Sequence, residues 1–156
     1  MEATNFLALY LSSSMVAFDY YAVPCSSPII GMHTFRIIYA IGHAIGLTEA
    51  PTDTILEFVS IPDITNTYTN MYPFYEDFGT SGVFLFSIIY GIFYGYLYKK
   101  SRTGGKLELI LYAIFLTFVS MEFIGEFIFT NFSITIQYVF FATLPFLFSK
   151  KKGNLA

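Results

Sequence analysis

The chain has 156 residues, of which 55% are hydrophobic, 21% are aromatic and only 12% are charged. A soluble domain carries roughly a quarter of charged residues, so this composition argues against an ordinary soluble enzyme. The apolar content excludes intrinsic disorder, and the single cysteine, Cys25, excludes a disulfide scaffold. The length is sufficient for about three or four membrane-spanning helices with their connecting loops.

The charges are unevenly placed. Residues 1–80 hold eight acidic residues and one basic residue, Arg36, which gives this part a net charge of −7. The other basic residues form two clusters beside apolar runs, Lys99, Lys100, Arg102 and Lys106 in the first and Lys150, Lys151 and Lys152 in the second. Such clusters mark the cytoplasmic side of a membrane, so we expect contact with a lipid bilayer and no binding of nucleic acid.

Residues 1–81 are expected to form an extracytoplasmic (periplasmic) loop region with short amphipathic helices, because five prolines interrupt the segment. Residues 6–18 are apolar, but the run is too short to span a membrane and no basic region precedes it. No export signal therefore accounts for an outer loop of this length. We expect the chain to be the carboxy-terminal part of a longer multi-span protein.

Residues 34–47 are predicted to form an amphipathic helix. His33, Arg36 and His43 fall on one face at a period of 3.6 residues, and the opposite face is apolar. One interpretation is an interfacial helix whose polar face meets water. The other is an anion or sugar-phosphate site, in which Arg36 pairs with phosphate and His33 or His43 acts as general acid or base. The spacing predicts no metal site.

The segment 53–79 is rich in Asn, Thr and Tyr. A short helix is predicted to begin near Asp53, where Thr54 and Glu57 match a capping box. Amide, hydroxyl and aromatic side chains suit carbohydrate, which predicts substrate contacts at Asn66, Tyr68, Tyr72, Tyr75 and Asp77. The alternatives are an aromatic belt at the membrane surface and, for Asp77, a structural role as the N-cap of the first span.

Three membrane-spanning helices are predicted at residues 82–98, 107–130 and 132–148. Residues 99–106 and 149–156 are then cytoplasmic, which places the C-terminus inside the cell. Glu122 and Glu126 share a helix face near the outer end of the second span, where they are candidate sugar contacts or catalytic bases. Alternatively, the second helix ends near Ser120 and both acids lie in an outer turn. Ser87, Gly91 and Gly95 form a small-residue stripe typical of close helix packing.

The stretch NTYTNMYPFYEDFGTSGVFLFSIIYGIFYGYLYKK, residues 66–100, resembles the carboxy-terminal region of bacterial O-antigen polymerases, the oligosaccharide repeat unit polymerases of the Wzy type. The family pattern runs from Asn-x-Tyr-Thr through aromatic residues to Asp-Phe-Gly-x-x-Gly, followed by a glycine-containing span that ends in Tyr and Lys. The matching positions are Asn66, Tyr68, Thr69, Tyr75, Asp77, Phe78, Gly79, Gly82, Gly91, Gly95 and Tyr98. The segments Ala17–Tyr20 and His33–Arg36 are also similar to parts of that family's outer loop.

This resemblance implies an all-α integral membrane protein of the bacterial inner membrane. Such an enzyme is a glycosyltransferase that joins repeat units carried on undecaprenyl diphosphate into O-antigen or a related surface polysaccharide, alongside other polysaccharide-assembly membrane proteins and without a cofactor. Arg36 would stabilise the departing diphosphate, although the family's Arg-x10-Gly arrangement is shifted here, with Leu47 at the glycine position and Gly46 before it. Complete members are much longer than this chain. The alternatives are a non-catalytic transporter or assembly subunit, and an O-antigen ligase.

Overall fold

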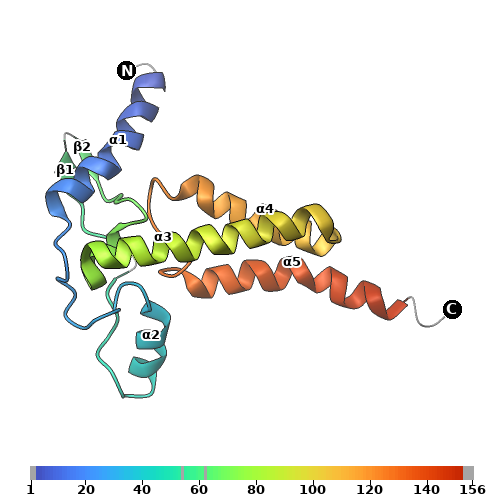
Figure 1. Cartoon of the computed structure of the whole chain (residues 1–156). Helices are drawn as coiled ribbons and strands as arrows, with labels where there is room; N and C mark the ends of the chain where they lie inside the picture. The colour runs from blue at the N-terminus through green and yellow to red at the C-terminus, as the bar shows by residue number, and fades with distance from the viewer. Residues whose placement is uncertain (1–2, 54, 62, 153–156) are drawn as a thin grey trace.

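The computed structural model describes residues 3–53, 55–61 and 63–152 (Figure 1). These residues are mostly helical, with five helices and one short antiparallel hairpin. The helices are α1 (Ala3–Tyr21), α2 (Arg36–Ala44), α3 (Tyr72–Thr103), α4 (Lys106–Met121) and α5 (Phe132–Lys152), and the hairpin pairs β1 (Val59–Ile61) with β2 (Asp63–Thr65). The predicted helical class is therefore observed, with the hairpin as an addition.

The three C-terminal helices run side by side and form the body of the molecule (Figure 1). A tight turn at Gly104 and Gly105 reverses the chain between α3 and α4, and the segment 122–131 reverses it again before α5. The α3–α4 turn and the C-terminal end of α5 lie at the same end of the bundle, whereas α1, α2 and the hairpin gather at the other end (Figure 1). Both basic clusters thus belong to one end of the bundle, and most of the acidic residues belong to the other.

Aromatic side chains form the core where α3 meets the 122–131 segment. Phe74 is 2% exposed and stacks on Phe86 with ring centroids 4.2 Å apart. Phe129 packs edge-on against Phe86 at 5.3 Å, and Tyr90 and Ile128 complete the buried cluster. This core lies next to the loops that carry most of the predicted site residues, so it fixes the N-terminal end of α3 relative to them.

The outer surface of the bundle is strongly apolar. Phe84, Ile92 and Phe141 are each more than 60% exposed, and further exposed residues of this kind line α4 and α5. A soluble monomer rarely shows so extensive an apolar surface. Among the described helices, α3 alone is long and apolar enough to cross a membrane, and α5 contains a shorter apolar stretch, Phe132–Phe146. The predicted number of three spans stays a prediction.

The structure corrects the predicted helix near Asp53. None of the described residues between 50 and 58 is helical, and Thr54 lies outside the described residues. The Glu57 carbonyl instead accepts a hydrogen bond of 3.2 Å from the Tyr68 hydroxyl. The β-branched residues that follow then pair in the hairpin, which is typical of their strand preference.

The helix predicted over residues 107–130 ends at Met121, as in the alternative with an outer turn. Two contacts explain the early end. The backbone N–H of Asn70 donates to the Glu122 carbonyl at 2.9 Å, and the Glu126 carboxylate binds the N–H groups of the residues that follow it. The segment therefore has hydrogen-bond partners outside a helix, so Glu122 and Glu126 do not share a helix face.

Asp77 is not an N-cap, because α3 begins five residues earlier, at Tyr72. The helix is interrupted at Gly79, where φ is 64° and ψ is −156°. The stripe of Ser87, Gly91 and Gly95 is exposed on α3, and a Cβ atom added at either glycine would meet nothing within 4 Å. Within the described residues this stripe therefore packs against no other helix.

Candidate functional site

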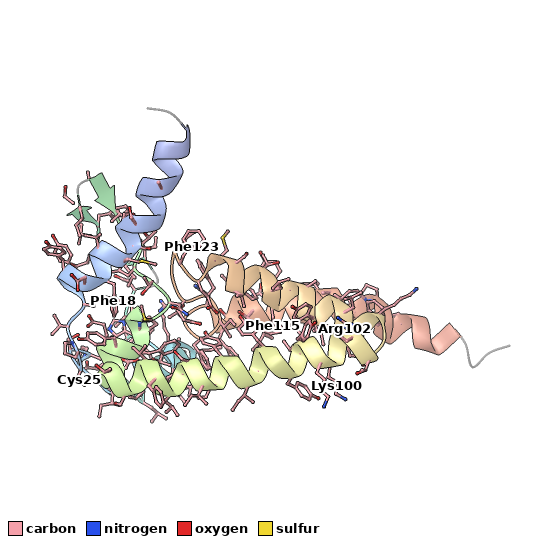
Figure 2. All side chains as sticks on the ribbon, turned by 45° about the horizontal axis from the view of Figure 1, so that its top comes forward. Phe18, Cys25, Lys100, Arg102, Phe115 and Phe123 are labelled. Carbon is pink, nitrogen blue, oxygen red and sulfur yellow. The ribbon has the colours of Figure 1, made fainter. Side chains whose placement is uncertain are left out.

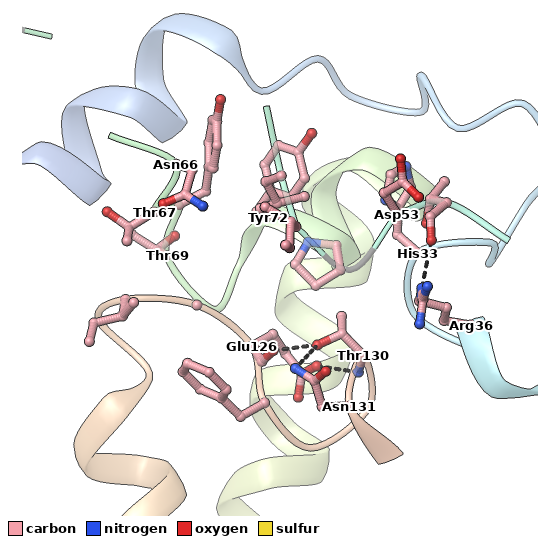
Figure 3. Close-up of a pocket in the computed structure, with 18 residues that line it drawn as sticks. His33, Arg36, Asp53, Asn66, Thr67, Thr69, Tyr72, Glu126, Thr130 and Asn131 are labelled. Atoms are coloured by element: carbon pink, nitrogen blue, oxygen red, sulfur yellow. Dashed lines mark hydrogen bonds between the residues drawn. The ribbon is translucent and has the colours of Figure 1, made fainter. Parts of the chain in front are cut away.

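A polar pocket of about 280 Å³ opens at the end of the bundle that carries α1 and α2 (Figure 3). Four loops and the beginnings of α2 and α3 surround it. Its lining residues are His33, Arg36, Thr52, Asp53, Ile55, Leu56, Asn66, Thr67, Tyr68, Thr69, Tyr72, Pro73, Ile124, Gly125, Glu126, Phe127, Thr130 and Asn131. Six of the residues predicted for the site are thus brought together, although they are up to 93 positions apart, from His33 to Glu126.

Arg36 supplies the positive charge of the pocket. Its Nε atom donates a hydrogen bond of 2.6 Å to the Thr52 carbonyl, which fixes the guanidinium at the pocket wall (Figure 3). This is the only side-chain hydrogen bond of Arg36 within the described part of the chain, and no carboxylate there forms a salt bridge with it. The two Nη groups are therefore available to an anionic ligand.

His33 lies beside Arg36 in the pocket and precedes α2 by three residues. Its ring packs edge-on against Tyr72, with centroids 6.0 Å apart and an interplanar angle of 83°. Burial lowers the pKa of His33 below its usual 6.5, and the nearby Asp77 carboxylate only partly offsets this effect. The imidazole is consequently neutral at pH 7 and able to accept a proton.

Tyr68 and Tyr72 form an aromatic wall, with ring centroids 4.7 Å apart and planes inclined by 40°. The amide of Asn66 and the hydroxyl of Thr69 belong to the same loop. Thr69 is 4% exposed, and its Oγ1 atom has no hydrogen-bond partner among the described residues. Rings beside amide and hydroxyl groups are the combination that binds sugars, through contacts to C–H faces and to hydroxyls.

Glu126 reaches the pocket, but its carboxylate is already occupied. It accepts hydrogen bonds from the backbone N–H groups of Ile128, Phe129 and Thr130 at 2.6 to 2.8 Å, and a further one from the Tyr90 hydroxyl. These bonds hold the 126–131 loop in shape (Figure 3). Glu126 is thus a positioning residue of the pocket wall, and the geometry does not favour the role of a base.

The other predicted site residues lie outside the pocket. His43 is exposed, and its Nδ1 atom is 3.2 Å from the Thr48 carbonyl. Tyr75 packs on Phe18, with ring centroids 5.2 Å apart. The prediction that these side chains contact substrate has no support from the pocket.

The carboxylates of Asp77 and Glu122 also serve the scaffold. Asp77 is 4% exposed and binds the backbone N–H groups of His33 and Thr34 at 3.2 and 2.6 Å. Glu122 accepts a hydrogen bond of 3.1 Å from the Asn70 side chain. Both acids therefore position the pocket loops from behind, and neither lines the cavity.

Sequence reasoning missed several residues of the pocket wall. Thr52, Thr130 and Asn131 carry no charge and follow no periodic pattern, so nothing in the sequence set them apart. Thr69 belongs to the Asn-x-Tyr-Thr run, and its place in this run was the one signal in the sequence that could have identified it as a pocket residue.

No protein-family profile matches the chain, and neither a curated protein nor a solved structure matches it.

Proposed function

We propose that the chain is the carboxy-terminal part of a bacterial inner-membrane glycosyltransferase that polymerises oligosaccharide repeat units carried on undecaprenyl diphosphate. The observation that carries the proposal is the polar pocket, which brings together three features: a guanidinium whose Nη groups have no hydrogen-bond partner among the described residues, a neutral imidazole, and an aromatic wall that carries an amide. A reaction between two lipid-linked sugars needs these groups: a cation for the diphosphate, a base and a surface that binds sugar.

The placement of charge supports an outer-face site. The pocket lies at the end of the bundle away from the C-terminal end of α3, where Lys100 and Arg102 project (Figure 2). If those basic residues face the cytoplasm, the pocket faces the periplasm. Lipid-linked repeat units are joined on that side of the membrane in the family that the sequence resembles.

The proposed chemistry assigns one role to each charged or titratable group. His33 accepts the proton of a sugar hydroxyl on the incoming repeat unit, and the hydroxyl oxygen forms a new bond to the anomeric carbon of the growing chain. The bond from that carbon to the carrier diphosphate breaks at the same time. Arg36 stabilises the negative charge on the departing diphosphate through its free Nη groups.

A complementation experiment tests this function. The complete reading frame is expressed in a bacterium that lacks its repeat-unit polymerase, and its surface polysaccharide is separated on a gel. We expect a ladder of long chains, and we expect Arg36→Ala to abolish it. Arg102→Ala is the matched control, because this arginine is exposed at the opposite end of the bundle, where it forms a hydrogen bond and a cation–π contact with Tyr98.

The outcomes separate the rival functions. Only single repeat units on the lipid core, in cells that express the protein well, would contradict the polymerase, because the host's own ligase attaches these units. Restored attachment of glycan in a strain that lacks its ligase would indicate a ligase. A protein that changes the glycan of neither strain would point to a transporter or an assembly subunit. Long chains from the Arg36→Ala variant would remove Arg36 from the site.

A further inference from the structure

The α2 helix turns its apolar side away from the rest of the protein. Ile38, Ile41 and Ile45 are 62%, 59% and 65% exposed, and at about 3.6 residues per turn they fall on one side of the helix. The described residues therefore leave more than half of each side chain uncovered. A helix on the surface of a soluble protein shows the opposite arrangement, with its apolar stripe packed on the core.

The polar side of α2 is the side that meets the protein. Arg36 donates a hydrogen bond of 2.6 Å to the Thr52 carbonyl, and the Nδ1 atom of His43 lies 3.2 Å from the Thr48 carbonyl. Residues 48–52 thus follow the polar side of the helix, from which Arg36 lines the polar pocket. The helix is therefore amphipathic with its polar side inward and its apolar side outward.

The position of α2 relates this exposed side to α3. Phe35, directly before α2, is 36% exposed, and its ring centroid lies 6.3 Å from that of Phe78 and 6.2 Å from that of Phe86. These contacts hold α2 beside the N-terminal part of α3, and α2 runs across the direction of α3 (Figure 1). Among the described helices, α3 is the one long and apolar enough to cross a membrane. If α3 spans the bilayer, α2 lies along the membrane plane.

We propose that α2 is an interfacial helix, which lies in the bilayer surface at the pocket end of the bundle with its three exposed isoleucines among the acyl chains. Helices of this kind bury their apolar face about 5–10 Å into the boundary between head groups and acyl chains. The exposed side carries no charged residue, so it complements acyl chains and not anionic head groups. Arg36 then lies on the water side of the same helix.

Two arguments favour lipid over a second copy of the chain as the occupant. The helix lies across the end of a candidate span, where a membrane surface would be. In addition, a nine-residue helix with three exposed isoleucines offers only a fraction of the about 800 Å² that each partner of a stable dimer buries. The placement requires α3 to span the bilayer, but it requires none of the catalytic roles proposed above.

Tryptophan fluorescence can locate α2, because the chain contains no tryptophan and a single one can be introduced. Ile41→Trp places the probe on the apolar side of α2, and Ile45→Trp provides a second position there. His43→Trp is the matched control, because His43 is also exposed but belongs to the polar side of the same helix. Ile92→Trp marks α3, where the native side chain is 69% exposed.

The full chain is reconstituted in phosphatidylcholine vesicles that contain brominated phosphatidylcholine as the quencher. The bromine atoms lie either near the head-group end of the acyl chains or near their centre. We expect bromine near the head groups to quench Ile41→Trp and Ile45→Trp about twofold, because an interfacial helix lies at that depth. His43→Trp should keep most of its emission. Bromine at the chain centre should quench Ile92→Trp more strongly than Ile41→Trp.

The other results would overturn the placement of α2. Equal quenching of Ile41→Trp and His43→Trp, or none in either, would exclude an interfacial helix. Blue-shifted but unquenched emission from Ile41→Trp would show that protein and not lipid covers the apolar side. In both cases, quenching of Ile92→Trp in the same vesicles would leave the membrane bundle and the proposed function intact. An unquenched Ile92→Trp would show that α3 does not enter the bilayer, and would overturn the proposed membrane function together with the placement of α2.

Discussion

The carboxylate of Asp77 accepts a hydrogen bond of 2.6 Å from the backbone N–H of Thr34, 43 positions earlier in the chain. The same carboxylate binds the N–H of His33 at 3.2 Å, so one side chain of α3 fixes the start of the segment that leads into Arg36. Thr34 is fully buried, and its hydroxyl lies 3.4 Å from the Pro73 carbonyl. The position of the predicted cation thus depends on an acid that is not itself in the pocket.

Replacing Asp77 with Asn should therefore loosen the loop that precedes α2 and leave the packing of the hydrophobic core unchanged. Asn offers one acceptor oxygen where Asp offers two, so one buried N–H loses its partner. We expect the free energy of unfolding to fall by about 1–3 kcal/mol. Thermal unfolding of the purified protein in detergent measures the effect. Asp19→Asn is the control, because Asp19 is exposed. Equal losses of unfolding free energy in both variants would show that the hydrogen bonds of Asp77 to the backbone do not stabilise the fold.

Glu126 is expected to matter for stability in the same way. Its carboxylate receives three backbone N–H groups and the Tyr90 hydroxyl, and these are charge-assisted bonds in a buried position. Glu126→Gln should lower the free energy of unfolding by about 2–3 kcal/mol, since the amide presents an N–H₂ group to one or more of these donors. Glu49→Gln, at an exposed site, should change it by less than about 0.5 kcal/mol.

Thermal unfolding again supplies the measurement, and a second variant identifies the cause. Tyr90→Phe removes one of the four donors and leaves the backbone bonds intact, so its effect should be smaller than that of Glu126→Gln. Full stability of Glu126→Gln would show that the loop does not depend on the carboxylate.

His33 makes stability depend on pH. Because burial lowers its pKa in the folded state, the unfolded chain binds a proton at about pH 6.5, before the folded chain does. The stability that the folded protein gains from a neutral His33 is therefore fully present above pH 6.5. This stability is lost as the pH falls from 6.5 through the folded-state pKa. We expect the unaltered protein to lose stability between pH 7 and 5 more steeply than His33→Gln does.

Unfolding temperatures of the two proteins across this pH range test the expectation. His43→Gln is the matched control, because His43 is exposed at the far end of α2. Parallel curves for the unaltered protein and His33→Gln would show that the His33 ring is not buried in the folded state.

The sequence could assign polar residues to a common site because these residues lie outside its long apolar segments. His33, Arg36 and residues 66–72 lie outside the long apolar helices or at the start of α3, and the polar pocket forms where they meet. The roles of Asp77 and Glu126 could not be assigned, because their partners are backbone N–H groups. Such groups carry no residue-type signature, so a carboxylate tether and a catalytic carboxylate look alike in a sequence.

The boundaries of the elements were less predictable than their presence. Composition predicts an apolar helix after Lys106, but its end at Met121 depends on Asn70, 52 positions before Glu122. The helix predicted near Asp53 rested on a local capping pattern, whereas in the structure the Glu57 carbonyl accepts a hydrogen bond from the Tyr68 hydroxyl, and the β1–β2 hairpin that follows was not predicted. In both places a contact between distant segments determines the local conformation.

Two glycines of α3 should respond oppositely to alanine. Gly79 has φ 64° and ψ −156°, a region that is essentially confined to glycine, and an added Cβ would lie 3.3 Å from the Cys25 sulfur. Gly79→Ala should cost about 1–3 kcal/mol of unfolding free energy. Gly91→Ala should gain up to about 1 kcal/mol, because this exposed helical position has nothing within 4 Å. Equal effects in thermal unfolding would contradict the break in α3.

The orientation of the bundle can be tested with its only cysteine. Cys25 is an exposed free thiol at the end of the molecule opposite Lys100 and Arg102 (Figure 2). If the basic α3–α4 turn faces the cytoplasm, a membrane-impermeant maleimide should label Cys25 in intact spheroplasts. The paired variant Cys25→Ser/Thr103→Cys moves the thiol to the exposed end of α3, and it should react only after the membrane is permeabilised. The opposite topology would give the opposite result: in intact spheroplasts the Thr103→Cys thiol would be labelled, and Cys25 of the unaltered protein would not. The pocket would then face the cytoplasm. In the family that the sequence resembles, lipid-linked repeat units are not joined on that side of the membrane.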